Sequence, residues 1–274
     1  MLISKKPVVA ILKLSGIISS ESRLGGRSGL NLNDLSDSLS KAFSFKNVKA
    51  VALLVNSPGG SPVQSALIGN RILELSKEKE VPVYCFIEDL AASGGYWLSC
   101  SANKIYAMES SIIGSIGVIS AGFGAVEAIK KIGVERRVYS EGKNKGLLDP
   151  FLPEKKEDIE QIKTIQKDLH KQFIGWVKQR RGKRLKAKDE ELFNAGIWSG
   201  IKSKELGLID GIGDYYSTMK SIFGSDIKFK DFSKKTSWLK QRFFSKTNYS
   251  YNANLVDAFL DRVEEKIIWS KFGL

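Results

Sequence analysis

Residues Val48–Ile87 read VKAVALLVNSPGGSPVQSALIGNRILELSKEKEVPVYCFI and contain the pattern that decides the fold. Val48–Asn56 is a continuous apolar run that ends at a turn, which predicts a strand covered on both faces. After the turn SPGG (57–60), apolar residues recur at helical spacing over Ser61–Lys77, and Val81–Ile87 is a second buried strand. A strand, a glycine turn, a helix and a strand in this order predict a βαβ unit.

The same alternation extends to both sides of this unit. Pro7–Ile18 is a β-branched run that predicts a strand, and Asn31 is placed to cap a helix that reaches about Phe43. The elements predicted beyond the unit are a helix from about Ser93 to Ala102, a strand at Lys104–Ala107, a helix near Val126–Lys131 and a strand at Arg136–Ser140. This alternation predicts an α/β fold with a largely parallel sheet, in which reactive groups gather at the carboxyl ends of the strands.

The pattern changes after Pro153, where a single long helix is predicted over Lys155–Arg181. A glycine-punctuated turn at Glu205–Gly213 and a short helix to Phe223 follow. We therefore predict one domain over residues 1–223 and a C-terminal extension over residues 224–274. The extension is basic and rich in aromatic residues, and it ends in an amphipathic helix at Asn254–Phe272.

The composition is that of a soluble globular chain, with 274 residues of which 42% are hydrophobic. The net charge of +13 favours anionic partners, although a lysine-rich solvated surface accounts for most of it. Cys85 and Cys100 lie on apolar segments, which predicts reduced core thiols. Neither an export signal nor the roughly 18 apolar residues of a membrane span is visible, so we expect a cytoplasmic protein.

Two basic segments raise the question of further partners. At the end of the long helix, residues 178–188 are interpreted as a solvated helix terminus, with an anionic lipid or partner contact as the alternative. In the extension, Lys228–Lys246 mixes basic and aromatic residues, a combination found on membrane surfaces and on single-stranded nucleic acid. No recognised nucleic-acid module accompanies it, so we expect no nucleic-acid partner. Packing on the protein body and peripheral contact with the inner membrane stay as alternatives.

The residues that point to chemistry begin with Ser93, which lies among alanines and glycines that let a reactant approach closely. A serine hydroxyl is a weak nucleophile and needs a base within hydrogen-bond reach. His170 is the single histidine, lies mid-helix and gives little support to a Ser-His-Asp triad. Among the many lysines, Lys145 stands out in its glycine-rich loop, but the residues alone leave the base open.

Four ordered motifs resemble the signal peptide peptidase A family of Ser/Lys peptidases. They are Ser57–Gly60, Ala91–Tyr96, Gly114–Val118, and the loop from Gly142 through Lys145 to Phe151. The segment from Leu206 to Gly213 also resembles the LGLxDxxG element of the family. The resemblance covers roughly residues 8–213.

The resemblance implies a role for each site residue. Ser93 is the nucleophile, Lys145 is the general base and later the general acid, and Ser115 orients the lysine. The N–H groups of Gly94 and Gly59 form the oxyanion hole. The implied reaction is hydrolysis of signal peptides or other small or unfolded hydrophobic chains, with no metal and no cofactor.

The resemblance also implies a ClpP/crotonase-like fold of repeated ββα units and a ring-like homo-oligomer, in which Ser93 of one subunit meets Lys145 of a neighbour. Many members carry a membrane anchor at the N-terminus that is not visible here. Two rival functions stay open: a crotonase-type acyl-thioester enzyme, which does not need Ser93 and Lys145, and a catalytically silent membrane-associated scaffold. For Ser93 alone, the competing interpretation is a small-residue packing site at a helix start.

Overall fold

The computed structural model describes residues 6–20, 29–142, 144–233, 263 and 266–274. It divides into two units. The first unit comprises Met1–Ile116 and Trp176–Leu274, and the second comprises Gly117–Gly175.

The first unit is built on a mixed sheet, which has eight strands in the described part of the chain. The strands are β1 (Val8–Ser15), β2 (Val48–Ser57), β3 (Val83–Ala92), β4 (Lys104–Ala107), β5 (Ile112–Gly114), β6 (Ile197–Ser199), β7 (Gly211–Ile212) and β8 (Lys228–Asp231). The order along the sheet is β6-β5-β3-β2-β1-β8, and β4 pairs with β3 and β7. All of these pairs are parallel except β5 with β6. The expected α/β fold with a largely parallel sheet is confirmed.

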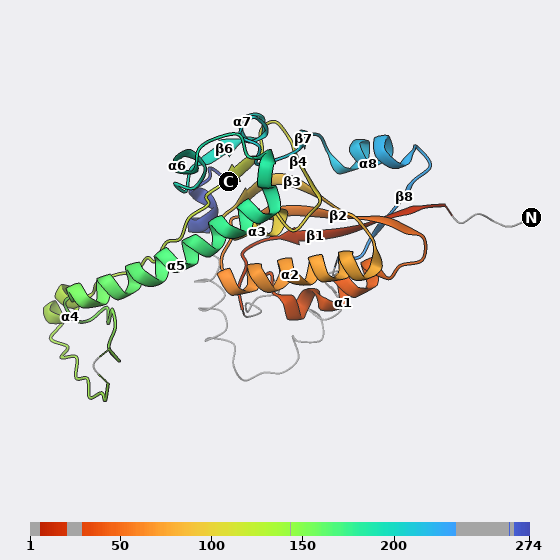
Figure 1. The fold of residues 1–274 in the computed structure, drawn as a ribbon. Coiled ribbons are helices and arrows are strands. Elements are labelled where there is room, and N and C mark those ends of the chain that lie inside the picture. Colours follow the sequence, from red (N-terminus) through yellow and green to blue (C-terminus); the bar gives the residue numbers. More distant parts are fainter. Residues whose placement is uncertain (1–5, 21–28, 143, 234–262, 264–265) are drawn as a thin grey trace, which may run out of the picture. The chain divides into compact units, whose positions relative to one another are not determined.

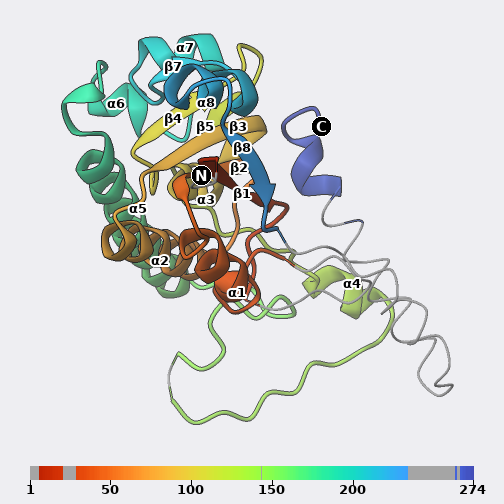
Figure 2. The same cartoon turned by 90° about the vertical axis from the view of Figure 1, so that its right-hand side faces the viewer.

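Helices cover both faces of this sheet, with α1 and α2 on one face and α8 on the other (Figures 1 and 2). The helices of the first unit are α1 (Leu32–Phe43), α2 (Pro62–Lys79), α3 (Gly94–Ser99), α6 (Asp189–Leu192), α7 (Gly200–Glu205) and α8 (Tyr215–Phe223). Val9 and Ile11 of β1 pack with Met219 of α8, whereas the alternate residues of this strand point to the opposite face. Two-sided burial explains why the central strands are apolar throughout.

Side-chain caps fix where two of these helices begin. The Asn31 side chain accepts a hydrogen bond from the Asp34 N–H at 2.8 Å and starts α1, as the sequence predicts. The Ser61 hydroxyl accepts from the Gln64 N–H at 3.3 Å, and Pro62 occupies the first helical position of α2. The start of α2 is thereby fixed immediately after the SPGG turn.

The second unit contains α4 (Val126–Lys131), a long connecting loop and most of α5 (Lys156–Arg181). The loop is joined to α4 by a hydrogen bond from Ala125 N–H to Pro150 O at 2.6 Å. It is joined to α5 by a hydrogen bond from Leu148 N–H to Asp158 Oδ2 at 3.2 Å. The helix α5 continues from this unit into the first, where it ends in a 3₁₀ turn at Gly182–Arg184.

Most elements predicted from the sequence are confirmed to within a few residues, namely β1, α1, β2, α2, β4, α4 and α5. The predicted strand Arg136–Ser140 is wrong, because these residues are exposed and have no sheet partner within the described ranges. Its apolar residues lie uncovered, with Tyr139 93% exposed, so the strand-like composition has no layer to pack against. The helix after Ser93 ends at Ser99 instead of Ala102.

The predicted C-terminal extension is described in part. Lys228–Asp231 forms β8, which pairs with β1 and so belongs to the sheet. The Lys230 ammonium lies 4.0 Å from the ring centroid of Phe45, so this basic residue packs on the protein body. The remainder of the basic segment, from 234 to 246, lies outside the described residues. So does most of the predicted helix at Asn254–Phe272, of which residues 266–270 are helical.

Candidate active site

Ser93 is the single residue that connects β3 to α3. Its backbone has φ 51° and ψ −121°, a conformation that residues other than glycine rarely adopt. Hydrogen bonds hold both sides of the turn, from Ser93 N–H to Gly114 O at 2.9 Å and from Trp97 N–H to Ser93 O at 3.0 Å. Such strain is typical of functional positions that the surrounding structure holds in place.

The SPGG turn packs backbone to backbone against the start of α3. A Cβ atom on Gly59 would lie 2.7 Å from Gly94 N and 2.8 Å from Ser93 Cβ. A Cβ on Gly95 would lie 2.4 Å from the carbonyl oxygen of Ser57. Only glycine fits at these positions, because any side chain would collide with backbone atoms. The structure therefore brings Gly59, Ser93 and Gly94 into direct contact.

The N–H groups around this turn differ in whether they already have an acceptor. Gly94 N–H lies in the first turn of α3 and has no hydrogen-bond acceptor among the described residues. Gly59 N–H donates to Ser57 Oγ at 3.1 Å, so an incoming oxyanion competes with this hydroxyl. The adjacent Gly60 N–H also has no acceptor within the described part of the chain. The motif resemblance assigns the second oxyanion donor to Gly59, and this assignment stays a prediction.

Ser115 follows β5 in the same way that Ser93 follows β3. The two strands are parallel neighbours in which Ala92 pairs with Gly114, so the next residue of each strand is a serine. Ser115 also has a positive φ, of 52°, and its N–H donates to Gly196 O at 2.7 Å. The structure thus brings both predicted serines to one edge of the sheet, at the carboxyl ends of neighbouring strands.

Lys145 belongs to the second unit, whereas the serines and glycines of the site belong to the first. Its side chain is exposed in the connecting loop, and its N–H donates to Gly142 O at 3.0 Å. The loop is held near this lysine by an ion pair between Arg136 and Asp149 at 3.1 Å. His170 also lies in the second unit, on α5.

Other side chains of types that commonly take part in catalysis lie apart from this site. Cys85 and Cys100 are free and buried, and burial raises the pKa of the Cys85 thiol to about 12 and that of Cys100 to about 11, so both stay protonated. In the described residues no group of His, Cys, Asp or Glu side chains could hold a metal ion. A search of the same residues finds no helix with the length and apolarity of a membrane span.

A cavity of about 510 Å³ lies beside the middle of β3 and the start of β5, the strands that lead to the two serines. Glu88 and Asp89 of β3 and Ile112 of β5 line it, but neither Ser93 nor Ser115 does. Burial raises the pKa of the Glu88 carboxyl, and the nearby Lys13 charge opposes that shift. The position of the glycine turns, and not this cavity, defines the candidate active site.

Comparison with known proteins gives consistent results. A family model described as Peptidase family S49 matches residues 75–223. The chain is 31% identical to the chloroplastic serine protease SPPA of Arabidopsis thaliana, over 75% of this chain and 30% of that protein. It is also 43% identical to a protein of Brucella melitensis named Na(+)/H(+) antiporter NhaA, over 97% of this chain. The chain spans 37% of the length of that protein, and the name refers to the full-length protein.

Solved structures share the fold at low sequence identity. A mutant of the membrane-bound stomatin-specific protease 1510-N, in complex with a substrate peptide, superposes with a TM-score of 0.53 at 13% identity. The match covers 88% of this chain and 99% of that one. The ClpP/crotonase-like fold predicted from the sequence agrees with this likeness.

Proposed function

Because the chain belongs to Peptidase family S49, we propose that it hydrolyses peptide bonds through an acyl-enzyme on Ser93, with Lys145 as the general base. The observation that supports this most directly is the conformation of Ser93. A non-glycine residue at φ 51°, packed against the backbone of Gly59, directly precedes Gly94, whose N–H has no acceptor among the described residues. A nucleophile next to a preorganised donor is the arrangement that acyl transfer needs.

In the proposed reaction, Lys145 Nζ takes the proton of Ser93 Oγ while the oxygen attacks the substrate carbonyl carbon. The oxyanion that forms accepts hydrogen bonds from Gly94 N–H and from Gly59 N–H, with Gly60 N–H as a further candidate in the same turn. The C–N bond then breaks, and the amine leaves with the proton from Lys145. Water, deprotonated by the same lysine, hydrolyses the ester and restores the Ser93 hydroxyl.

Lys145 acts as a base only when its amine is uncharged, which requires burial or a neighbouring cation. Its side chain is exposed within the second unit. We propose that a neighbouring subunit of a ring-like homo-oligomer, together with bound substrate, buries this amine, and that Ser115 Oγ orients it. The proposed substrates are signal peptides and other small or unfolded hydrophobic chains.

The test compares wild type with Ser93→Ala and Lys145→Ala on a fluorogenic hydrophobic peptide, with Lys155→Ala as an exposed-lysine control from the same unit. We expect both site variants to lose activity while the oligomer persists. Normal turnover by either one would rule out the assigned dyad.

Mixing the two inactive variants tests whether the dyad forms between subunits. If Ser93 of one subunit works with Lys145 of the next, mixed rings contain some intact sites and regain part of the wild-type rate. A mixture that exchanges subunits, as shown by mass spectrometry, and stays inactive would place both groups of the dyad in one subunit.

A further inference from the structure

The helix that directly follows the proposed nucleophile has few internal hydrogen bonds to fix its position. α3 is six residues long, so its last carbonyl groups have no partners within the helix. It begins directly after Ser93, whose strained backbone persists only where surrounding structure fixes it. The contacts that hold α3 therefore decide whether the Ser93 hydroxyl stays in place.

The first of these contacts is Trp176, the residue at which α5 enters the first unit. Its ring stacks on Trp97 with 5.4 Å between ring centroids and 11° between planes. Its Nε1–H donates to the Trp97 carbonyl at 3.0 Å, while Trp97 N–H donates to the Ser93 carbonyl at the same distance of 3.0 Å. A Cβ on Gly69 would lie 3.5 Å from both rings, so α2 packs closely on the stack. Trp176 thus reaches Ser93 through one intervening residue.

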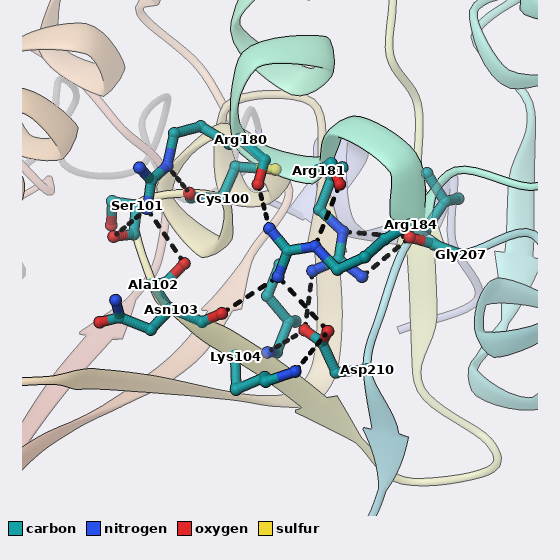
Figure 3. A network of polar contacts seen from close by, with 12 residues as sticks. Cys100, Ser101, Ala102, Asn103, Lys104, Arg180, Arg181, Arg184, Gly207 and Asp210 are labelled. Atoms are coloured by element: carbon teal, nitrogen blue, oxygen red, sulfur yellow. Dashed lines mark hydrogen bonds and ion pairs between the residues drawn. The ribbon is translucent and has the colours of Figure 1, made fainter.

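The second contact is Arg180, one helical turn after Trp176 on α5. Its Nε donates to Cys100 O at 2.8 Å, and its Nη2 lies 3.4 Å from Ser101 O and 3.3 Å from Ala102 O (Figure 3). Arg184 in turn donates to the carbonyl of Arg180. The guanidinium therefore provides donors for three successive carbonyl groups just beyond the end of α3, where a positive charge also interacts favourably with the helix dipole.

The neighbouring Arg181 serves a different part of the fold. Its guanidinium is 1% exposed and donates to Gly207 O at 3.0 and 2.8 Å and to Asp210 Oδ2 at 2.7 Å (Figure 3). These bonds fix the segment after α7. That segment meets α3 through one hydrogen bond, from the Tyr96 hydroxyl to Leu208 O at 2.7 Å. The two adjacent arginines thus allow a comparison between donors placed directly at the end of α3 and donors placed on an element that α3 contacts.

We propose that Trp176 and Arg180 are positioning residues of the peptidase reaction, which hold α3 so that Ser93 Oγ stays aimed at the substrate carbonyl. This inference rests on the proposed function of Ser93. Trp176 acts through the backbone of α3, and Arg180 acts through the three carbonyl groups that directly follow this helix. A displacement of about 1 Å in a nucleophile costs on the order of a hundredfold in rate, so loosening α3 has a measurable effect without unfolding the protein.

The experiment compares Trp176→Phe and Arg180→Lys with Arg181→Lys, all in the full chain and well below the lowest melting temperature of the set. Trp176→Phe keeps an aromatic ring but removes the donor and part of the stacked surface, and Arg180→Lys keeps the charge and removes the fork of donors. We measure kcat and KM on the hydrophobic peptide, together with the rate at which a fluorophosphonate probe labels Ser93.

We expect Trp176→Phe and Arg180→Lys to lower kcat and the labelling rate about tenfold with KM within about twofold of wild type. Arg181→Lys lowers the melting temperature at least as much, because it disturbs a buried ion pair, but keeps kcat within about twofold. The inference is wrong if the first two variants keep both rates, or if Arg181→Lys loses kcat as they do. Ser93→Ala distinguishes a failure of this inference from a failure of the proposed function. If Ser93→Ala is still active, the proposed function fails, whatever the tryptophan and arginine variants show.

Discussion

Ser93 and Ser115 stand side by side in the sheet, each directly after the residue pair Ala92 and Gly114 of β3 and β5, and both have a positive φ, of 51° and 52°. The hydrogen bond from Ser93 N–H to Gly114 O, at 2.9 Å, ties the two positions together. Two strained serines at the ends of neighbouring strands are hard to explain by packing alone. They form a pair whose geometry the sheet register sets.

For Ser115→Ala we expect kcat to fall about tenfold while KM stays the same, because the proposed role of the hydroxyl is to orient Lys145 and not to bind substrate. The pH dependence of kcat/KM should also change on its rising limb, which reports the base. Steady-state kinetics between pH 6 and about 10 measure both effects. An unaltered rate and pH profile would remove Ser115 from the site.

Replacing Ser93, the proposed nucleophile, with glycine should separate stability from activity. Both Ser93→Gly and Ser93→Ala are expected to be inactive, but glycine adopts φ 51° without strain. The free energy of unfolding of Ser93→Gly should therefore exceed that of Ser93→Ala by about 1 kcal/mol. Urea unfolding of the two variants measures the difference, and equal midpoints and slopes would show that the strain is not stored at this residue.

The close backbone contact at Gly59 predicts a severe effect of one added carbon atom. Gly59→Ala would place Cβ 2.7 Å from Gly94 N and would also be strained at φ 101°. We expect activity to fall at least a hundredfold, because the oxyanion donors and Ser93 are forced apart. Gly175→Ala is the control, since a Cβ there meets nothing within 4 Å and alanine favours the helix. Wild-type activity in Gly59→Ala would contradict the packing described above.

Much of this architecture follows from local sequence. The parts that do not follow from it depend on pairing between segments that are far apart in the sequence. The boundaries of α1 and α2 follow from Asn31 and Ser61, whose caps act within three residues. By contrast, β3 continues past its predicted end at Ile87 to Ala92 because residues 90–92 pair with β5, a partner of three residues that has no periodicity to detect. The five candidate site residues come from the motif resemblance, and their roles stay predictions. The hydrogen bond that engages Gly59 N–H depends on the rotamer of Ser57, which no sequence pattern reveals.

The buried ion pair between Arg181 and Asp210 predicts a dependence of stability on pH. Burial raises the pKa of the Asp210 carboxyl, but the hydrogen bond and charge of Arg181, with the Ile105 N–H and Arg184, outweigh it and set the pKa below its ordinary 3.8. A carboxyl with a lowered pKa stabilises the fold above its ordinary pKa, and that contribution is lost as the pH falls through the lower folded value.

We therefore expect the free energy of unfolding to drop as the pH falls below about 4, and Asp210→Asn to show less of this drop. At neutral pH the same variant should be less stable by about 3 kcal/mol, because it leaves a buried arginine unpaired. Thermal unfolding of both proteins from pH 7 to about 3 provides the measurement. Parallel curves for the two proteins would show that Asp210 is not the group that titrates.

The basic segment that follows β8 predicts a salt-sensitive affinity for anionic membranes. At low salt, we expect the protein to sediment with vesicles that contain an anionic lipid. As the salt concentration rises and the Debye length shortens from about 30 to 8 Å, we expect the protein to be released. A variant with Lys234, Lys235 and Lys240 changed to glutamine should bind less, whereas Lys6→Gln should bind as wild type. Binding that is indifferent to salt and to these lysines would leave packing on the body as the interpretation of this segment.

The place of β8 at one end of the strand order has a consequence for how copies of the protein avoid sticking together. A strand with an unpaired side is a template for another strand, and uncontrolled pairing of this kind leads to aggregation. β8 is four residues long, and three of them, Lys228, Lys230 and Asp231, are charged. A short, charged strand at this position covers the long apolar β1 and is itself a poor template. The chain thus protects the long and largely buried β1 with a short segment in which three of four residues are charged.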